Sequence, residues 1–274
     1  MAASPKTSWR VPAYLPYLQP ALTAEAVAAA ERAIGFPLPE AYLDLLRAQN
    51  GGYIRLELPD LLHDVIAGIG PQFPSLTDFD WTEAQDHVSF PLQGLVPFDG
   101  DGHWFLCLDY RDDGNTPAVS HIDVECDRQT RLAASFAGYL ARLRVEAGDD
   151  YVLESTLELG EVVARLSAAL GAVFEPPDTW AQGYPVHRAA LGSAEAPEWL
   201  WLSPNRVPRG FVRPEDPRYD ELKDLLPGQA SRYPEVPESG LLLTATEGVA
   251  AEVVAACAAA GLAIRPLRAY LEAP

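Results

Sequence analysis

Two closely spaced helices, each ended by glycine, constrain this sequence more than any other feature. Residues 23–34 repeat apolar side chains at helical spacing after Thr23, a residue type that caps helix N-termini, and Gly35 ends the pattern. A second helix follows a short link and ends at Asn50-Gly51-Gly52, because these residues tolerate a positive φ. We therefore predict a helical hairpin. The residues expected to hold it together are Gly35, Leu38, Pro39, Tyr42, Leu46, Asn50, Gly51 and Gly52.

After this hairpin the apolar residues change to the period of a strand. The segment 104–108 is apolar on both faces, as in a strand buried on both sides, and Trp104 is expected in the core. Asp-Gly-Asp-Gly at 99–102 indicates a hairpin turn, and Ser135 is expected to cap a last helix. The order helix, helix, sheet, helix predicts an α+β domain. The predicted strands are residues 53–58, 95–98, 103–110 and 119–127.

The chain is predicted to divide into two domains, residues 1–146 and residues 147–274, because a glycine-containing acidic stretch separates two sets of ordered elements. The second part ends in a strand–helix–strand pattern at 241–267, which is typical of a smaller α/β or α+β domain. Trp199 and Trp201 are predicted to share one strand face, either for packing or as a partner surface.

Three ordered blocks in the first half carry a resemblance to a known family. They are the helix–turn–helix block at 33–52, the glycine turn and apolar strand at 95–109, and the closing helix at 133–140. Together they are similar to the hallmark of the SUKH superfamily, in its Smi/Knr branch, over about residues 20–145. The hallmark residues themselves have structural roles in turns, helix starts and packing.

The resemblance implies an α+β module in which a helical hairpin and a C-terminal helix pack on a mostly antiparallel sheet. Bacterial members are typically immunity proteins that bind and neutralise polymorphic toxins, many of them nucleases or deaminases. Fungal relatives act as interaction proteins in cell-wall regulation. We therefore expect a non-catalytic protein-binding module without a cofactor.

Charge narrows the class of partner. The chain has a formal net charge of -19, which argues against nucleic acid and anionic membrane surfaces as ligands. Between Glu57 and Asp127 there are fifteen acidic residues and one basic residue, Arg111. This stretch is interpreted as a docking face for a cationic protein such as a cognate toxin; a solvated surface is the alternative. The candidate partner-binding residues are Asp78, Asp80, Trp81, Asp99, Asp101, Asp112, Asp113, Asp123 and Glu125.

No catalytic motif is recognised, and no catalytic residue is proposed. His121, Asp123 and Glu125 could share a strand face, but same-face neighbours on one strand lie about 7 Å apart, so no metal site is expected. Gly68-Ile-Gly70 precedes no helix and indicates no phosphate site. Three cysteines without a paired spacing, and no signal-peptide or membrane-spanning pattern, favour a reduced, cytoplasmic protein.

The leading hypothesis is thus a bacterial immunity protein that acts by stoichiometric binding to a basic, nuclease-like toxin. An interaction or regulatory scaffold without a toxin partner is the alternative, and a metal-dependent enzyme is the least favoured. The sequence leaves open the partner's identity, the oligomeric state and the role of residues 147–274.

Overall fold

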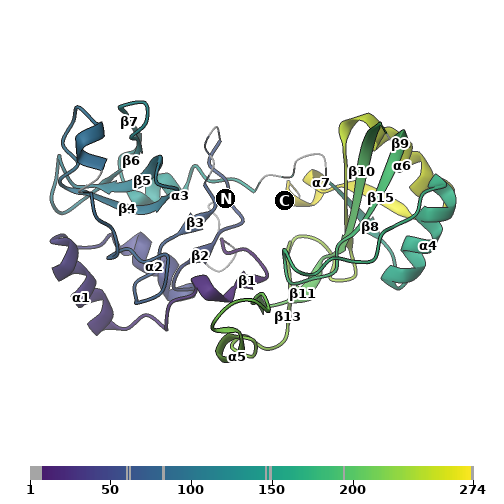
Figure 1. The fold of residues 1–274 in the computed structure, drawn as a ribbon, viewed down its shortest axis with the longest axis horizontal. Helices are drawn as coiled ribbons and strands as arrows, with labels where there is room; N and C mark the ends of the chain where they lie inside the picture. The colour runs from purple at the N-terminus through teal and green to yellow at the C-terminus, as the bar shows by residue number, and fades with distance from the viewer. Residues whose placement is uncertain are drawn as a thin grey trace. The chain divides into compact units, whose positions relative to one another are not determined.

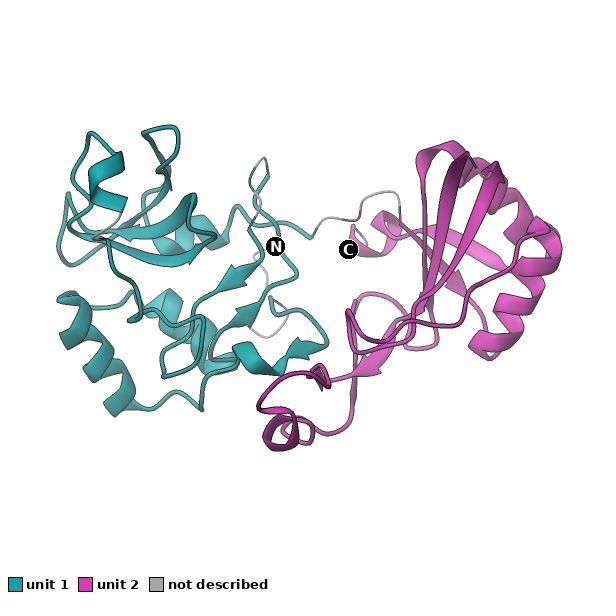
Figure 2. Ribbon diagram, in the orientation of Figure 1, with its two compact units in different colours: residues 1–145 teal, residues 146–274 magenta. Residues whose placement is uncertain are grey.

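The computed structural model describes residues 8–59, 61, 63–81, 84–145, 147, 150–193 and 195–272. The chain forms two compact units, Met1–Val145 and Glu146–Pro274 (Figure 2), and each has its own hydrophobic core. None of the described helices has the length and apolar character needed to cross a membrane.

Unit 1 contains a helical hairpin, a four-stranded antiparallel sheet and a closing helix (Figure 1), which confirms the predicted fold class. The helices are α1 (Ala24–Ile34), α2 (Glu40–Ala48) and α3 (Phe136–Leu140), with 3-10 helices η2 (Leu15–Tyr17) and η3 (Ala84–His87). The short strands are β1 (Ala13–Tyr14), β2 (Gly52–Tyr53) and β3 (Val65–Ile66). The sheet consists of β4 (Leu95–Gly100), β5 (Trp104–Asp109), β6 (Ala118–Asp123) and β7 (Arg128–Ala133), in that order.

Local capping sets the helix ends. The Thr23 side chain accepts a hydrogen bond from the Ala26 amide at 3.1 Å, and Gly35 ends α1 at φ 81°. Ser135 caps α3 by accepting from the Gly138 amide at 3.1 Å. These three ends lie where the sequence predicts them, because each depends on residues within one turn.

The sheet is covered on both faces. On one face Leu106, Leu108 and Val119 belong to the main core of unit 1, together with Tyr42 of α2 and Phe136 of α3. On the other face a smaller core forms beneath the loop that precedes β4; it contains Leu92, Leu95, Phe105, Cys107 and Ile122. The prediction of a strand buried on both sides is therefore confirmed for β5.

The Asn-Gly-Gly sequence after α2 connects the backbone at Pro20 with the backbone at Ile69 through hydrogen bonds of the Asn50 side chain. The buried side-chain amide of Asn50 donates to Pro20 O at 2.6 Å and Ile69 O at 2.9 Å, and its oxygen accepts from the Ile69 amide at 2.9 Å. Gly51 has φ 90°, and a Cβ there would lie 2.8 Å from the Gly68 nitrogen. Gly68 is therefore a close-packing residue of the fold, a role that its GxG spacing alone does not indicate.

Two strand predictions for unit 1 are wrong in extent. Residues 53–58 do not form one strand: after β2, single bridges join Ile54 to Trp9, Glu57 to Arg144 and Leu58 to Leu61. The predicted strand 119–127 ends at Asp123, and a tight turn with Asp127 at φ 51° leads into β7. The strand β7 was not predicted because most of its polar side chains are exposed and show no alternation.

Unit 2 is an antiparallel sheet in the order β15-β8-β14-β10-β9, with helices α4 and α6 packed in the core on one face. The order of its central elements corresponds to a split βαβ arrangement, to which β9 adds an edge strand. The strands of this sheet are β8 (Tyr151–Glu154), β9 (His187–Ser193), β10 (Ala196–Pro204), β14 (Leu241–Ala245) and β15 (Ala263–Pro266). The helices are α4 (Leu159–Leu170), α5 (Tyr219–Leu222), α6 (Glu247–Ala259) and α7 (Arg268–Leu271). The proline-rich segment adds β11 (Arg206–Pro208), β12 (Gly210–Phe211) and β13 (Gln229–Ser231).

In unit 2, a buried asparagine orders the proline-rich segment, and two tryptophans lie on one face of β10. Asn205 is fully buried and orders the proline-rich segment, because its side chain donates to Tyr233 O at 3.1 Å and accepts from the Tyr233 amide at 2.9 Å. Trp199 and Trp201 share one face of β10, with ring centroids 6.4 Å apart, and both are partly exposed. Arg188 lies over the Trp199 ring at 5.3 Å.

Asp109, at the end of β5, makes a largely buried ion pair. Its carboxylate accepts from Arg111 Nε at 2.8 Å and Nη2 at 2.7 Å, and from the Ser120 hydroxyl at 2.7 Å. Burial raises the pKa of Asp109, but the hydrogen bonds from Arg111 and Ser120 outweigh this effect and hold the pKa below its ordinary value.

This ion pair is expected to make the free energy of unfolding of unit 1 depend on pH in the acidic range. A carboxyl whose pKa is lower in the folded state stabilises the fold above about pH 4, its unfolded pKa, and loses that contribution as the pH falls through the folded value. We expect Asp109→Asn to lower the free energy of unfolding by about 1.5–3 kcal/mol at pH 7. The loss should be smaller at pH 3. Denaturant unfolding at both pH values measures it.

Asp112→Asn is the matched control, because Asp112 also pairs with an arginine, Arg131, but on the exposed surface. Loss of this exposed ion pair is expected to lower the free energy of unfolding by about 0–1 kcal/mol. A cost of Asp109→Asn that is the same at pH 7 and pH 3 would contradict this assignment.

Candidate binding cavity

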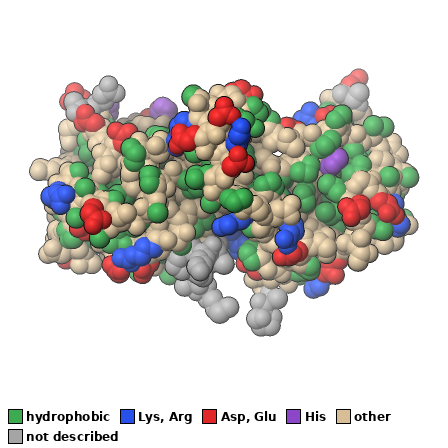
Figure 3. All heavy atoms as spheres, turned by 90° about the horizontal axis from the view of Figure 1, so that it is seen from below, with side chains coloured by type: hydrophobic (Ala, Val, Ile, Leu, Met, Phe, Trp, Pro, Cys, Tyr) green, Lys and Arg blue, Asp and Glu red, His purple; other side chains and the backbone are tan. Residues whose placement is uncertain are grey.

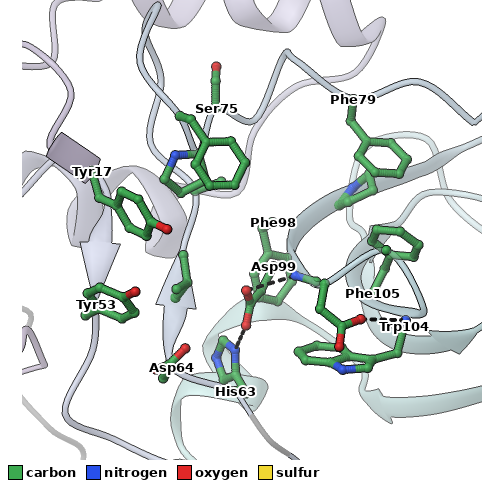
Figure 4. A pocket seen from close by; sticks show the side chains of 18 of the residues that line it. Tyr17, Tyr53, His63, Asp64, Ser75, Phe79, Phe98, Asp99, Trp104 and Phe105 are labelled. Carbon is green, nitrogen blue, oxygen red and sulfur yellow. Dashed lines mark hydrogen bonds and ion pairs between the residues drawn. The ribbon is translucent and has the colours of Figure 1, made fainter. Parts of the chain in front are cut away.

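A cavity of about 730 Å³ opens in unit 1 (Figure 4). Its lining comes from three places: Tyr17 of η2, the paired strands β2 and β3 with the loops that flank β3, and the turn between β4 and β5. This volume lies in the range of roughly 300–1,000 Å³ that is typical of ligand pockets.

Aromatic side chains form two opposite sides of the cavity (Figure 4). On one side Tyr17 and Tyr53 stack with ring centroids 5.2 Å apart, and Phe73, 66% exposed, meets Tyr17 edge-on at 5.5 Å. On the other side Phe79 packs against Phe105 at 4.9 Å, next to Trp104. The cavity therefore offers flat π faces to a bound group from two directions.

The polar part of the lining is acidic. No lysine or arginine is found among the described residues that line the cavity. Among these described lining residues, His63 is the one with a basic side chain. Arg10 lies over the Tyr53 ring at 5.7 Å but does not line the cavity. By contrast, acidic and basic side chains occur together on the molecular face drawn in Figure 3. The carboxylates of the cavity are Glu57, Asp64, Asp78, Asp99 and Asp101.

Asp99 lies between the two aromatic sides and begins a buried chain of hydrogen bonds. Its Oδ2 is 2.5 Å from His63 Nδ1, and its Oδ1 accepts from the Gly100 amide at 2.8 Å. The other ring nitrogen of His63 pairs with the Tyr139 hydroxyl. Burial, and then the charge of Asp99, raise the pKa of Tyr139 well above its ordinary value, so this hydroxyl keeps its proton. The His63 ring therefore links the Asp99 carboxylate to the Tyr139 hydroxyl, with one ring nitrogen toward each.

Two other carboxylates of the cavity are shifted in opposite directions. Burial by the cavity walls, and then the charge of Asp99, raise the pKa of Asp64. Burial also raises the pKa of Asp101, but the amides of His103 and Trp104 donate to its carboxylate at 2.9 and 3.1 Å and bring the pKa below its ordinary value. Asp101 is thus held in place by the turn, whereas the charge of Arg10 only partly offsets the rise in the pKa of Asp64.

The structure divides the predicted partner-binding residues into two groups. Asp78, Asp99 and Asp101 line the cavity. Asp123 and Glu125 lie near the same end of the sheet, because Trp104 pairs with Asp123 in the β5–β6 register. The turn between β5 and β6, with Asp112 and Asp113, lies at the other end of these six-residue strands, roughly 17 Å away at 3.4 Å per residue. The nine residues therefore do not form one site.

Several of these residues already have local partners. Asp113 accepts from the Asn115 amide and Asp123 from the Cys126 amide, both at 2.9 Å, while Glu125 pairs with His103 at 2.7 Å. Trp81 donates its indole N–H to Leu95 O at 3.0 Å and packs against the smaller core. Asp80 is exposed beside it.

The predicted burial of Trp104 is only partly right, because its half-buried ring lines the cavity and stacks on His121 at 5.8 Å. Cys107 is buried in β5, and burial raises the pKa of its thiol well above the ordinary value. Across the residues that the structure describes, no three histidine, cysteine or acidic side chains come together closely enough to hold a metal ion.

Sequence reasoning missed Tyr17, Tyr53, His63 and Phe73 as site residues. Tyr17 lies upstream of the recognised hairpin, Tyr53 begins a segment that was interpreted only as a strand, and His63 and Phe73 fall in segments without a clear period. Glu57 and Asp64 were counted within the acidic stretch but not selected. Their high local charge was the one available signal, and it did not separate acids in the cavity from acids in turns.

Comparison with known proteins relates unit 1 to a protein family. Residues 21–142 match the model of the SMI1 / KNR4 family (SUKH-1), which confirms the resemblance of the N-terminal half to this family. The match contains the helical hairpin, the four-stranded sheet and most of the cavity lining, and it ends before unit 2. No curated protein matches the chain.

Proposed function

From this SUKH-1 match, we propose that unit 1 is a non-catalytic binding domain that holds a basic protein in a stoichiometric complex. Domains of this family are known in immunity proteins that neutralise toxins, so a basic, nuclease-like toxin is the partner class we favour. The observation that supports this choice best is the aromatic cavity lined by five carboxylates and, among the described residues, by no lysine or arginine.

Charge would act before contact is made. Acidic residues concentrated between Glu57 and Asp127 produce a negative potential that attracts a cationic protein and raises the rate of encounter. Proteins that bind nucleic acid carry clustered basic residues at their own sites. An acidic domain that covers such a site would block access to nucleic acid without any chemical step.

Capture with the intact chain, followed by a growth assay, tests this proposal. We expect one saturable basic partner that is toxic when expressed alone, and growth that recovers when the chain is co-expressed. A non-toxic partner would favour the scaffold alternative. Failure to recover any saturable partner would show that the acidic stretch is only a solvated surface.

Charge reversal should reveal which end of the sheet meets the partner. The double variant Asp78→Lys/Asp80→Lys changes Asp78, which lines the cavity, and the exposed Asp80 two residues further on. The double variant Asp112→Lys/Asp113→Lys makes the same charge change at the other end of the sheet. We expect the first pair to lower the association rate about tenfold at low salt and the second about twofold. Stopped-flow measurements at several salt concentrations distinguish them. Equal effects would place the contact elsewhere.

A further inference from the structure

We propose that the cavity of unit 1 receives an arginine side chain from the basic partner, with the guanidinium group between the two aromatic sides and against the carboxylate of Asp99. This inference rests on the proposed function, because it names the chemical group by which the same site would recognise its partner. The volume of about 730 Å³ also leaves room for residues next to that arginine.

The first support is the charge of Asp99. Its side chain is only 8% exposed, and its carboxylate contacts the His63 ring and the Gly100 amide. Within the described part of the chain, no lysine or arginine forms an ion pair with it. Buried carboxylates are normally paired with a cation or neutralised, since burial without compensation is costly. A carboxylate has about four acceptor positions, so Asp99 retains capacity for a cationic donor from the cavity side.

The second support is the shape and chemistry of the walls. Guanidinium is planar, stacks on aromatic rings and donates two parallel hydrogen bonds to a carboxylate. Tyr17, which stacks on Tyr53, and Trp104 place aromatic rings on opposite sides of the cavity (Figure 4), and the Tyr53 ring already has one guanidinium over it, that of Arg10 at 5.7 Å. A lysine ammonium is a compact, strongly hydrated charge that uses such faces less well. A metal ion would instead need converging ligands, and the described residues form no such group.

The third support is Asp64, whose ionised form is disfavoured by burial and by Asp99. A carboxyl with a raised pKa in the folded state lowers stability at neutral pH, so Asp64→Asn is expected to leave the free energy of unfolding unchanged or increased. A cation bound nearby would reverse this disadvantage. Residues that improve binding at the expense of stability are typical of functional sites.

Short blocked peptides test the proposal with the full chain. The probes are acetyl-Gly-Arg-Gly-amide, the same peptide with lysine, and the same peptide with citrulline, which retains the shape of arginine without its charge. Titration followed by amide NMR should show saturable shifts at Gly100, Gly102 and Trp104 for the arginine peptide. We expect affinity at least fivefold weaker for lysine and no saturable shifts for citrulline.

Variants locate the site. Asp64→Asn should weaken binding of the arginine peptide about tenfold without lowering the free energy of unfolding, whereas Asp113→Asn should leave the binding of the peptide unchanged. Absence of saturable binding, equal binding of citrulline, or shifts that avoid the cavity would each overturn the proposal. If the arginine peptide fails while a basic partner still binds in a salt-dependent way, only this inference fails. If the peptide binds but no partner is captured, the proposed function fails and the arginine site stands.

Discussion

Replacing Gly51 with alanine is expected to destabilise unit 1 by about 2–5 kcal/mol, a large part of a typical domain stability of roughly 5–15 kcal/mol. At φ 90° an alanine costs about 1–2 kcal/mol. Its Cβ would also lie 2.8 Å from the Gly68 nitrogen, and relieving such overlap costs about 1–3 kcal/mol more. Because Gly68 lies close to β3 and the cavity wall, the change should reach the binding site as well.

Gly35→Ala is the matched control for this substitution. Gly35 has a similar φ of 81°, but a Cβ there would meet no atom within 4 Å. The cost in free energy of unfolding should therefore be the backbone cost alone, about 1–2 kcal/mol. Hydrogen exchange of the α2 and β5 amides in the full chain reports on unit 1 alone. Equal losses of protection in the two variants would show that the contact between Gly51 and Gly68 contributes nothing.

Filling the cavity from within is expected to reduce partner affinity about 100-fold, equivalent to about 2.8 kcal/mol. The substitution is Val65→Arg. Val65 lines the cavity and pairs with Tyr53 across β2 and β3, so the new side chain shares the Tyr53 face. Its guanidinium would occupy the space and offset one carboxylate, in direct competition with the partner.

Asn115→Arg adds the same charge in the turn between β5 and β6, at the opposite end of the sheet. It should change affinity by less than about threefold, because only the long-range field is altered. Titration calorimetry with the captured partner compares the two variants. If Val65→Arg binds as tightly as the unmodified chain, the cavity does not take part in the complex.

The helices of unit 1 could be predicted from the sequence because their ends are local. Thr23, Gly35 and Ser135 act within one turn of the backbone, and their residue types identify the caps directly. The strand β5 was also predictable, since an apolar run beside a glycine turn is distinctive. In contrast, β7 is polar at the edge of the sheet, and the short bridges after β2 contact three separate segments, which leaves no periodic signal.

The cavity could not be predicted in the same way. Tyr17, Tyr53 and Asp99 lie far apart in the sequence and line one cavity. The hydrogen bonds of the Asn50 side chain and the close approach of Gly51 to Gly68 hold the backbone segments that carry them. Charge counting identified the acidic stretch correctly. It could not show that Asp112 and Asp113 lie at the other end of the sheet from Asp99 and Asp101.

The most direct test of a stoichiometric acidic binder is calorimetry of the full chain with its captured partner at several salt concentrations, followed by mass spectrometry of both proteins. We predict one partner per chain, affinity that falls as salt increases, and both proteins recovered unaltered. A partner chemically altered by substoichiometric amounts of the chain, or affinity independent of salt, would contradict this function.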